Sequence, residues 1–244
     1  MSQSIYEIAK EILLREAAGG QAAGSMELVK ISASKAREYA EKVFSENGKE
    51  LDVEIPNFDK NFTTAQEKAA MGKTKRKDMP VITSDDVKNL QTRLKNGDLD
   101  IHSPYSPKTN PKDPFPQGLK TSDAKEFLSR GKEDGEEHDD IVKYSLVKVP
   151  VGQLQPIQQQ VYFDKSIDPI AENGAEGSAK FFTTKSILIA SSDLRIIDGH
   201  HRFLGAVLID PKMKVPVLLI DLPIDKLLPL TLAYGDSIGN KRNA

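Results

Sequence analysis

The stretch Leu194-Arg-Ile-Ile-Asp-Gly-His-His-Arg-Phe-Leu-Gly-Ala-Val-Leu208 is the part of this 244-residue chain that decides its fold. It begins as an apolar, strand-like run that ends at Asp198-Gly199, and helical apolar periodicity starts directly afterwards at His200. The sequence therefore predicts a strand-to-helix turn that brings a carboxylate, two imidazoles and a guanidinium close together. Backbone N–H groups and the helix dipole favour an anion at such a helix N-terminus, and the guanidinium of Arg202 suits a phosphate group.

Short strands and helices are predicted to alternate on both sides of this stretch. The predicted strands cover 146–151, 186–190, 194–197 and 215–221, and the predicted helices cover 200–208 and 224–232, the latter interrupted by Pro229. Ser-Ser-Asp, a turn composition, separates the second and third strands and predicts a hairpin. Residues 172–178 are expected to form a loop. Mixed strands with a few helices predict an α+β fold for this half.

The first half of the chain is predicted to be mainly helical and irregular. The expected helices cover 4–18, 34–45, 84–96 and 122–130, periodicity is weak over 57–77, and a proline-rich extended loop is expected over 102–118. Six acidic residues within 132–140 are typical of a solvated linker. We therefore expect an N-terminal region over 1–140 and an α+β core over 141–244.

Composition excludes several classes of protein. The chain has no cysteine, which excludes structural disulfides, thiolate metal sites and cysteine nucleophiles and fits a reducing cytoplasm. No apolar stretch reaches the roughly 18 residues that a membrane span needs, and the N-terminus lacks the pattern of a secretory signal, so a cytoplasmic protein with no membrane partner is expected. Phosphate-binding P-loops, kinase-type glycine loops, serine-hydrolase elbows and His-Glu-x-x-His zinc motifs are all missing from the sequence.

A basic segment, Lys73-Thr-Lys-Arg-Lys77, is the candidate nucleic-acid contact. Lys73, Lys75, Arg76 and Lys77 could neutralise phosphates as a local patch, although the formal net charge of the whole chain is -2. An ordinary solvated loop explains the same residues, and no aromatic residue is interleaved for stacking on bases. Both interpretations stay open from the sequence.

The residues of the turn each admit a structural and a functional interpretation. Asp198 suits a helix N-cap or a general base that takes a proton from a hydroxyl. His200 and His201 are helix neighbours whose side chains point about 100 degrees apart, so no metal site is predicted for the pair. His201 and Arg202 could pair locally with Asp198 or bind phosphate. Gly199 permits a tight turn and a close approach of backbone to a ligand.

Asp198-Gly-His-His-Arg202, placed after a strand and before a helix, resembles the signature of the ParB/sulfiredoxin superfamily. The resemblance is nearest to its phosphotransferase branch, which includes free-serine kinases and phage kinases of hydroxymethyl-pyrimidine bases in DNA. It covers roughly the last 100 residues, from about Ser145 onward. Val147-Lys-Val-Pro-Val-Gly-Gln-Leu-Gln-Pro-Ile-Gln158 is similar to the opening strand and the Leu-x-Pro-x-Gln element of the superfamily, and Val215-Pro-Val-Leu-Leu-Ile220 is similar to its later core strand.

The resemblance implies a small mixed-sheet core and a nucleotide-dependent phosphotransferase. ATP or ADP with Mg²⁺ would be the donor, and the acceptor would be a primary hydroxyl, either hydroxymethyl-pyrimidine in DNA or free serine. By this resemblance the catalytic residues are Asp198 and His200, and the phosphate-binding residues are Gly199, His201, Arg202 and Gln158. A phage-encoded protein would act in the host cytoplasm.

Two further functions remain open from the sequence. One is a ParB-like module that binds nucleotide and DNA without transfer, and the other is an interaction protein in which the motif is a relic. Sulfiredoxin chemistry is excluded because it needs a cysteine in the motif. The acidic residue that free-serine kinases are expected to carry near the first strand is also missing, because residues 158–160 are all glutamine.

Overall fold

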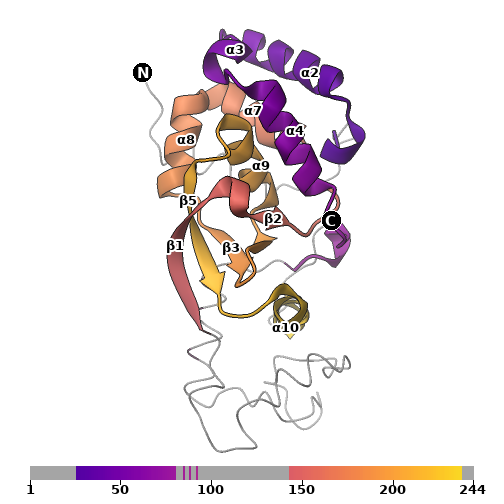
Figure 1. Ribbon diagram of the computed structural model, residues 1–244, viewed down its shortest axis with the longest axis vertical. Helices are drawn as coiled ribbons and strands as arrows, with labels where there is room; N and C mark the ends of the chain where they lie inside the picture. Colours follow the sequence, from indigo (N-terminus) through magenta and orange to yellow (C-terminus); the bar gives the residue numbers. More distant parts are fainter. Residues whose placement is uncertain (1–25, 81–84, 86–87, 89–91, 93–142, 238–244) are drawn as a thin grey trace, which may run out of the picture.

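A five-stranded mixed sheet forms the centre of the computed structural model, which describes residues 26–80, 85, 88, 92 and 143–237 (Figure 1). The strands are β1 (Tyr144–Pro150), β2 (Gln155–Pro156), β3 (Leu188–Ser191), β4 (Arg195–Asp198) and β5 (Lys214–Ile220). The α-helices are α2 (Ala33–Glu46), α3 (Leu51–Glu54), α4 (Phe58–Ala69), α7 (Asp164–Asn173), α8 (Ala175–Thr184), α9 (His200–Ile209) and α10 (Ile224–Ser237). The predicted α+β class is therefore confirmed.

The strands lie in the order β1-β5-β3-β4-β2. Outer strand β1 pairs antiparallel with β5, from Tyr144 opposite Ile220 to Pro150 opposite Lys214. Strands β5 and β3 run parallel, β3 and β4 form the predicted antiparallel hairpin, and β4 pairs parallel with the short edge strand β2. Because β4 lies inside the sheet, the turn that follows it is held from both sides.

Helix α9 lies at the centre of the helical layer and is buried from His200 to Leu208. It packs against α4, α7 and α8, and Figure 1 shows α2 and α3 beyond them at one end of the molecule, with α10 at the other end. A helix that is apolar on every side belongs in a core rather than on a surface. The sequence Phe-Leu-Gly-Ala-Val-Leu after Arg202 has this character.

Residues from both halves of the chain share one hydrophobic core. Phe58 and Phe62 of α4 pack edge-on against Phe163, the residue before α7, with ring centroids 6.1 and 5.6 Å apart. The same cluster continues into α9 through Phe203 and into β5 through Val217. The described part of the N-terminal region, residues 26–80, therefore packs on the sheet domain, and the predicted boundary near residue 140 lies outside the described residues.

Helix α4 occupies a segment for which the sequence predicted only weak periodicity. Its buried residues are Phe58, Asn61, Phe62, Ala65 and Ala69. The buried amide of Asn61 donates to the carbonyl oxygens of Leu208 and Ile209 at 2.9 and 3.2 Å. Asn61 therefore satisfies carbonyls at the C-terminus of α9, which otherwise have no partner within their helix.

The predicted loop over 172–178 is wrong, because helices α7 and α8 are separated by Gly174 alone. Gly174 has a φ of 76°, a left-handed conformation that ends one helix and starts the next. Lys49 donates to the carbonyls of Ala171 and Glu172, and the carboxylate of Glu54 accepts from the N–H of Ala175 at 2.7 Å. Distant side chains thus cap both helix ends.

Two other predicted helices can be compared with the structure. The helix over 34–45 is confirmed as α2, with Ser32 as its N-cap accepting from the N–H of Lys35 at 3.3 Å. Helix α10 continues through Pro229, so the predicted interruption is wrong.

The predicted elements over 4–18, 102–118, 122–130 and 132–140 lie outside the described residues, as does most of 84–96. In the described ranges no helix combines the length and apolar character needed to cross a bilayer.

Candidate functional site

The predicted strand-to-helix turn is present, since β4 ends at Asp198 and α9 begins at His200. Gly199 joins them in a left-handed conformation with a φ of 96° and a ψ of 30°. A Cβ at this position would collide with Cδ2 of Leu188 and would come within 3.1 Å of the guanidinium of Arg202. Glycine is therefore required here for two reasons: its backbone adopts the left-handed conformation, and a Cβ would not fit.

Asp198 and Arg202 form an ion pair across the turn. Nη2 of Arg202 donates to Oδ2 of Asp198 at 2.5 Å, and Nη1 donates to the carbonyl oxygen of Ile187 at 2.7 Å. The Arg202 side chain is 8% exposed, whereas that of Asp198 is 39% exposed. The local pairing considered from the sequence is thus real. The N-cap interpretation of Asp198 is wrong, because Gly199 is the N-cap and no side chain caps the helix.

His200 is buried, and its Nε2 faces the backbone of the segment after β2. The N–H of Gln158 donates to this nitrogen at 3.3 Å, which requires Nε2 to carry no proton. Burial, followed by the charges of Arg76 and Arg202, lowers the pKa of His200 to about 3. The imidazole is therefore neutral near pH 7, and this geometry suits a positioning residue better than the predicted catalytic one.

His201 is buried beside Tyr162, 7% exposed, with the two rings nearly parallel and their centroids 5.9 Å apart. Burial, then the charge of Arg76 and the neighbouring His200, lowers its pKa well below the usual value. Within the described part of the chain its Nε2 has no hydrogen-bond partner. Buried polar nitrogens are normally paired with protein groups or ordered water, so this nitrogen is open to a partner outside the described residues.

Gln158 is 2% exposed, and its side-chain amide donates to the carbonyl oxygen of Gln160. The side chain of Gln160 in turn accepts from the N–H of Arg76 at 2.7 Å. Gln158 therefore lies next to His200, and its side chain bonds to the backbone two residues further along the chain. The phosphate contact that the resemblance implies for Gln158 stays a prediction. Gln158 links the motif helix to the basic segment.

The basic segment packs as an extra extended stretch against residues 157–159. The N–H groups of Lys73 and Thr74 donate to the carbonyl of Ile157 at 2.9 Å, and the N–H of Gln159 donates to Thr74 at 2.8 Å. A Cβ on Gly72 would collide with the carbonyl oxygen of Gln158, so glycine permits this close approach. No pattern in the sequence predicts that these two segments pair.

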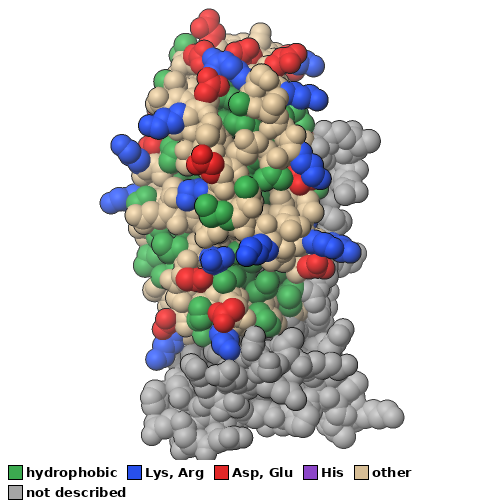
Figure 2. Space-filling view, turned by 45° about the vertical axis from the view of Figure 1, so that its right-hand side comes forward, with side chains coloured by type: hydrophobic (Ala, Val, Ile, Leu, Met, Phe, Trp, Pro, Cys, Tyr) green, Lys and Arg blue, Asp and Glu red, His purple; other side chains and the backbone are tan. Residues whose placement is uncertain are grey.

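The four predicted nucleic-acid contacts do not share one surface. Lys73, Lys75 and Lys77 are exposed, but Arg76 is only 8% exposed and its guanidinium carbon lies 5.9 Å from the ring centroid of Tyr162. On the face in Figure 2, Lys and Arg side chains follow one another across the middle of the molecule, and no described His side chain is visible there. Arg76 thus belongs to the buried site and the three lysines to the surface.

Two residues of this site were missed by sequence reasoning, Tyr162 and Lys165. Nζ of Lys165 lies 5.2 Å from the ring centroid of Tyr162. Burial, and then the charge of Arg76, lowers the pKa of Lys165. The only local signal was an amphipathic pattern over the residues that form α7, and it says nothing about which residues meet His201 in space.

A separate cavity of about 230 Å³ lies between the basic segment and α10. Its lining residues are Met71, Lys73, Thr74, Ile157, Arg195, Ile224, Asp225, Leu228 and Pro229. Ile157 lines this cavity, and the next residue, Gln158, donates its N–H to Nε2 of His200. The cavity and His200 are therefore linked through adjacent residues of the chain.

No group of three or more His, Asp or Glu side chains suited to a metal ion occurs among the residues that the structure describes. Comparisons with family models, with characterised proteins and with solved structures find no match to this chain. The arrangement at the start of α9 is therefore the main basis for assigning a function.

Proposed function

We propose that this protein is a nucleotide-dependent phosphotransferase that moves a phosphoryl group to a primary hydroxyl. The observation that carries the proposal is the start of α9. There, a helix N-terminus with no side-chain cap lies beside a half-exposed carboxylate and among buried cations. Free N–H groups at a helix N-terminus bind phosphate oxygens, and the helix dipole favours the negative charge. The resemblance of 198–202 to the phosphotransferase signature supports the same conclusion.

Asp198 is the residue proposed to act on the acceptor. Oδ2 accepts from Arg202, which orients the carboxylate, while no described group donates to Oδ1. In the proposed reaction Asp198 takes the hydroxyl proton as the acceptor oxygen bonds to the terminal phosphorus of the nucleotide. The bond from that phosphorus to the bridging oxygen breaks, and the shortened nucleotide leaves with the bonding electron pair.

The role of Arg202 differs from the direct phosphate contact that the resemblance implies. Its two terminal nitrogens already donate to Asp198 and to the carbonyl of Ile187. We assign it to orienting the base, and we assign phosphate binding to the N–H groups of the first turn of α9. Mg²⁺ would neutralise charge on the transferred group, held by the phosphate oxygens of the nucleotide.

The acceptor is proposed to be hydroxymethyl-pyrimidine in DNA, with free serine as the second choice. The exposed lysines 73, 75 and 77 are on a segment that is hydrogen-bonded to residues 157–159, directly before and after Gln158. A basic surface next to the site favours a polyanionic acceptor over a free amino acid.

A nucleotide-binding and DNA-binding module without transfer activity is the alternative. The ion pair between Asp198 and Arg202 favours it, because a carboxylate held by a guanidinium also serves a purely structural role. In that case nucleotide would bind at the same helix, and no acceptor would be phosphorylated.

The test is transfer of label from γ-labelled ATP with Mg²⁺. Free serine, unmodified DNA and DNA containing 5-hydroxymethyluracil are offered in parallel. Asp198→Asn should abolish transfer while leaving nucleotide binding largely intact. The matched control is Asp210→Asn, because Asp210 follows the opposite end of α9 and is exposed. Full activity of Asp198→Asn contradicts the base assignment, and bound nucleotide with no labelled acceptor favours the alternative.

A further inference from the structure

The cavity of about 230 Å³ between the basic segment and α10 takes no part in the transfer reaction described above. Most of the side chains that line it are apolar: Met71, Ile157, Ile224, Leu228 and Pro229. Protein interiors contain few voids larger than a water molecule, and an apolar cavity of about 150 Å³ admits a benzene ring. Pockets for drug-sized ligands measure about 300–1,000 Å³. The cavity therefore has room for one six-membered ring and is too small for a whole nucleotide.

Hydrogen bonds around the cavity hold its walls in place. On one side the N–H of Lys73 donates to the carbonyl of Ile157 at 2.9 Å. On the other side Asp193 joins two walls, because its Oδ2 pairs with Nε of Arg195 at 3.1 Å and its Oδ1 accepts from the N–H of Ile224 at 3.0 Å. A pocket that is already formed binds its ligand without the cost of ordering its walls.

Four polar side chains line the same cavity: Lys73, Thr74, Arg195 and Asp225. Among the described residues, the side chains of Lys73, Thr74 and Asp225 form no hydrogen bond or ion pair, and Arg195 uses only its Nε. The ammonium and guanidinium groups are donors, the carboxylate is an acceptor, and the hydroxyl is both. An apolar slot with donors and acceptors around it suits a nucleobase, which has apolar faces and polar edges.

The apolar lining of the cavity is partly open to solvent. Met71 is 53% exposed, although large apolar side chains are normally buried. Ile224 and Leu228, four residues apart on α10, share one face of that helix and are half-buried. A base in the cavity would cover these side chains, and the flexible side chain of Met71 adapts readily to a flat ring.

We propose that the cavity holds one unstacked base of a DNA strand whose phosphates lie along Lys73, Lys75 and Lys77. All three lysines are exposed, and Lys73 also lines the cavity, so the basic surface is continuous with it. Proteins that bind single strands combine such a cationic track with surfaces on which bases stack, and apolar side chains can replace aromatic ones around an extruded base. The proposal rests on the proposed function only for DNA as the polymer.

The base held in the cavity is a neighbour of the reacting base. Asp198 does not line the cavity, and the lining residue of β4, Arg195, is three residues earlier, about 10 Å along the strand. The cavity therefore anchors the strand away from the carboxylate, and its occupation can be measured without the transfer reaction.

The first experiment compares two oligonucleotides by fluorescence anisotropy with the full chain. One is oligothymidylate, and the other has the same length and backbone but lacks every base. The unchanged protein should bind oligothymidylate at least about fivefold more tightly, which is the lower end of what stacking one base contributes. Equal affinity for the two oligonucleotides overturns the proposal, because only the backbone would then be bound.

Leu228→Glu tests whether the cavity is the origin of this affinity ratio. A carboxylate in the cavity should bring the ratio close to one, whereas a general effect of charge lowers both affinities and leaves the ratio unchanged. Leu146→Glu is the matched control, because Leu146 is 62% exposed on β1 at the opposite edge of the sheet from β2. A ratio in Leu228→Glu equal to that of the unchanged protein overturns the proposal.

A second measurement uses the fact that the chain contains no tryptophan. Met71→Trp places a single tryptophan at the cavity, where a bound base should quench its fluorescence. Val53→Trp is the control, because Val53 is 71% exposed on α3 and does not line the cavity. Oligothymidylate should quench only Met71→Trp, and equal quenching of both variants or of neither overturns the proposal. Equal quenching of Met71→Trp by free thymidine at the same concentration overturns the assignment to a DNA strand.

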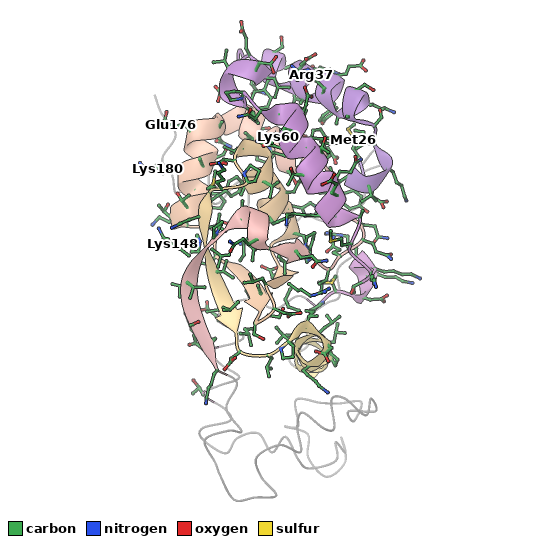
Figure 3. The ribbon with its side chains drawn as sticks, viewed as in Figure 1. Met26, Arg37, Lys60, Lys148, Glu176 and Lys180 are labelled. Carbon is green, nitrogen blue, oxygen red and sulfur yellow. The ribbon has the colours of Figure 1, made fainter. Side chains whose placement is uncertain are left out.

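The position of the phosphates is tested by salt dependence. Lys75→Met should reduce the slope of log affinity against log salt concentration by about 0.7 for both oligonucleotides, as expected for the loss of one phosphate contact to a single strand. Lys148→Met is the control, because Lys148 is exposed and projects outward from the outer strand β1 (Figure 3). Equal slopes in the two variants overturn the placement of the strand along the basic segment.

The two proposals fail in different ways. If oligothymidylate binds through a base and no acceptor is ever labelled, the base subsite stands and the transfer reaction does not. If an acceptor is labelled but the two oligonucleotides bind equally, the transfer reaction stands and the base subsite does not.

Discussion

The N–H of Gln158 donates to Nε2 of His200 over 3.3 Å, and this bond joins two segments 42 residues apart. It ties the residues after β2 to the first turn of α9 and sets which nitrogen of the imidazole carries the proton. The side chain of Gln158 also donates to the carbonyl of Gln160, and the side chain of Gln160 accepts from the N–H of Arg76. These bonds connect His200 to the basic segment. The turn, the segment after the edge strand and the basic segment are thus joined by hydrogen bonds.

The pKa of His200 predicts a dependence of stability on pH. Folded His200 stays neutral down to about pH 3, whereas in the unfolded chain it gains a proton below about pH 6.5. Its contribution to stability is therefore fully present above pH 6.5 and is lost as the pH falls, at up to about 1.4 kcal/mol per pH unit. Chemical unfolding between pH 7 and 5 measures this slope. His200→Gln should have a shallower slope, and parallel curves for the two proteins would contradict the prediction.

Replacing Gly199 with alanine should destabilise the fold by roughly 2–4 kcal/mol. Alanine at a φ of 96° costs about 1–2 kcal/mol, and collision of its Cβ with Leu188 adds about 1–2 kcal/mol more. The control is Gly48→Ala, because Gly48 has a φ of 68° with nothing within 4 Å of the added Cβ, so only the backbone cost of about 1–2 kcal/mol applies. Equal losses in the two variants, measured by urea unfolding, would show that Leu188 yields easily.

Asn61→Ala should lower the free energy of unfolding by about 1–3 kcal/mol, because it leaves the buried carbonyl of Leu208 and the partly buried carbonyl of Ile209 without their donor. Asn47→Ala is the matched control. The amide of Asn47 also donates to a helix carbonyl, that of Val43 at 2.8 Å, but this bond is exposed and water can replace it. A loss for Asn61→Ala no larger than for Asn47→Ala would remove the proposed capping role.

Arg202→Lys should cost about 1–3 kcal/mol in stability, because one ammonium cannot donate in the fork geometry that joins Asp198 to the carbonyl of Ile187. Arg195→Lys is the control. Arg195 forms an ion pair with Asp193 at 3.1 Å in which both side chains are 40% exposed, and such surface pairs contribute about 0–1 kcal/mol. Thermal unfolding of both variants measures the difference. An Arg202→Lys protein as stable as the unchanged one would show that the fork is dispensable.

Several elements of the fold followed from local sequence. The β3–β4 hairpin has a turn composition between two apolar runs, and α9 follows its strand without a linker, so pattern and length were sufficient. Helix α2 carries its own start signal in Ser32. The loop predicted over 172–178 failed for the opposite reason. Its helix ends are capped by Lys49 and Glu54, more than 100 residues earlier, which no local pattern can reveal.

Some residues of the candidate site could likewise be predicted from local sequence, and others could not. The sequence alone determined that a carboxylate, a glycine, two histidines and an arginine meet at a strand-to-helix turn, because they are five consecutive residues that span the end of a strand and the start of a helix. Tertiary structure decided what surrounds them, since Arg76, Tyr162 and Lys165 reach the turn only after α4, α7 and the basic segment have packed on the sheet domain. Local spacing carries information about neighbours within a turn, whereas contacts across long separations depend on how apolar faces pack together.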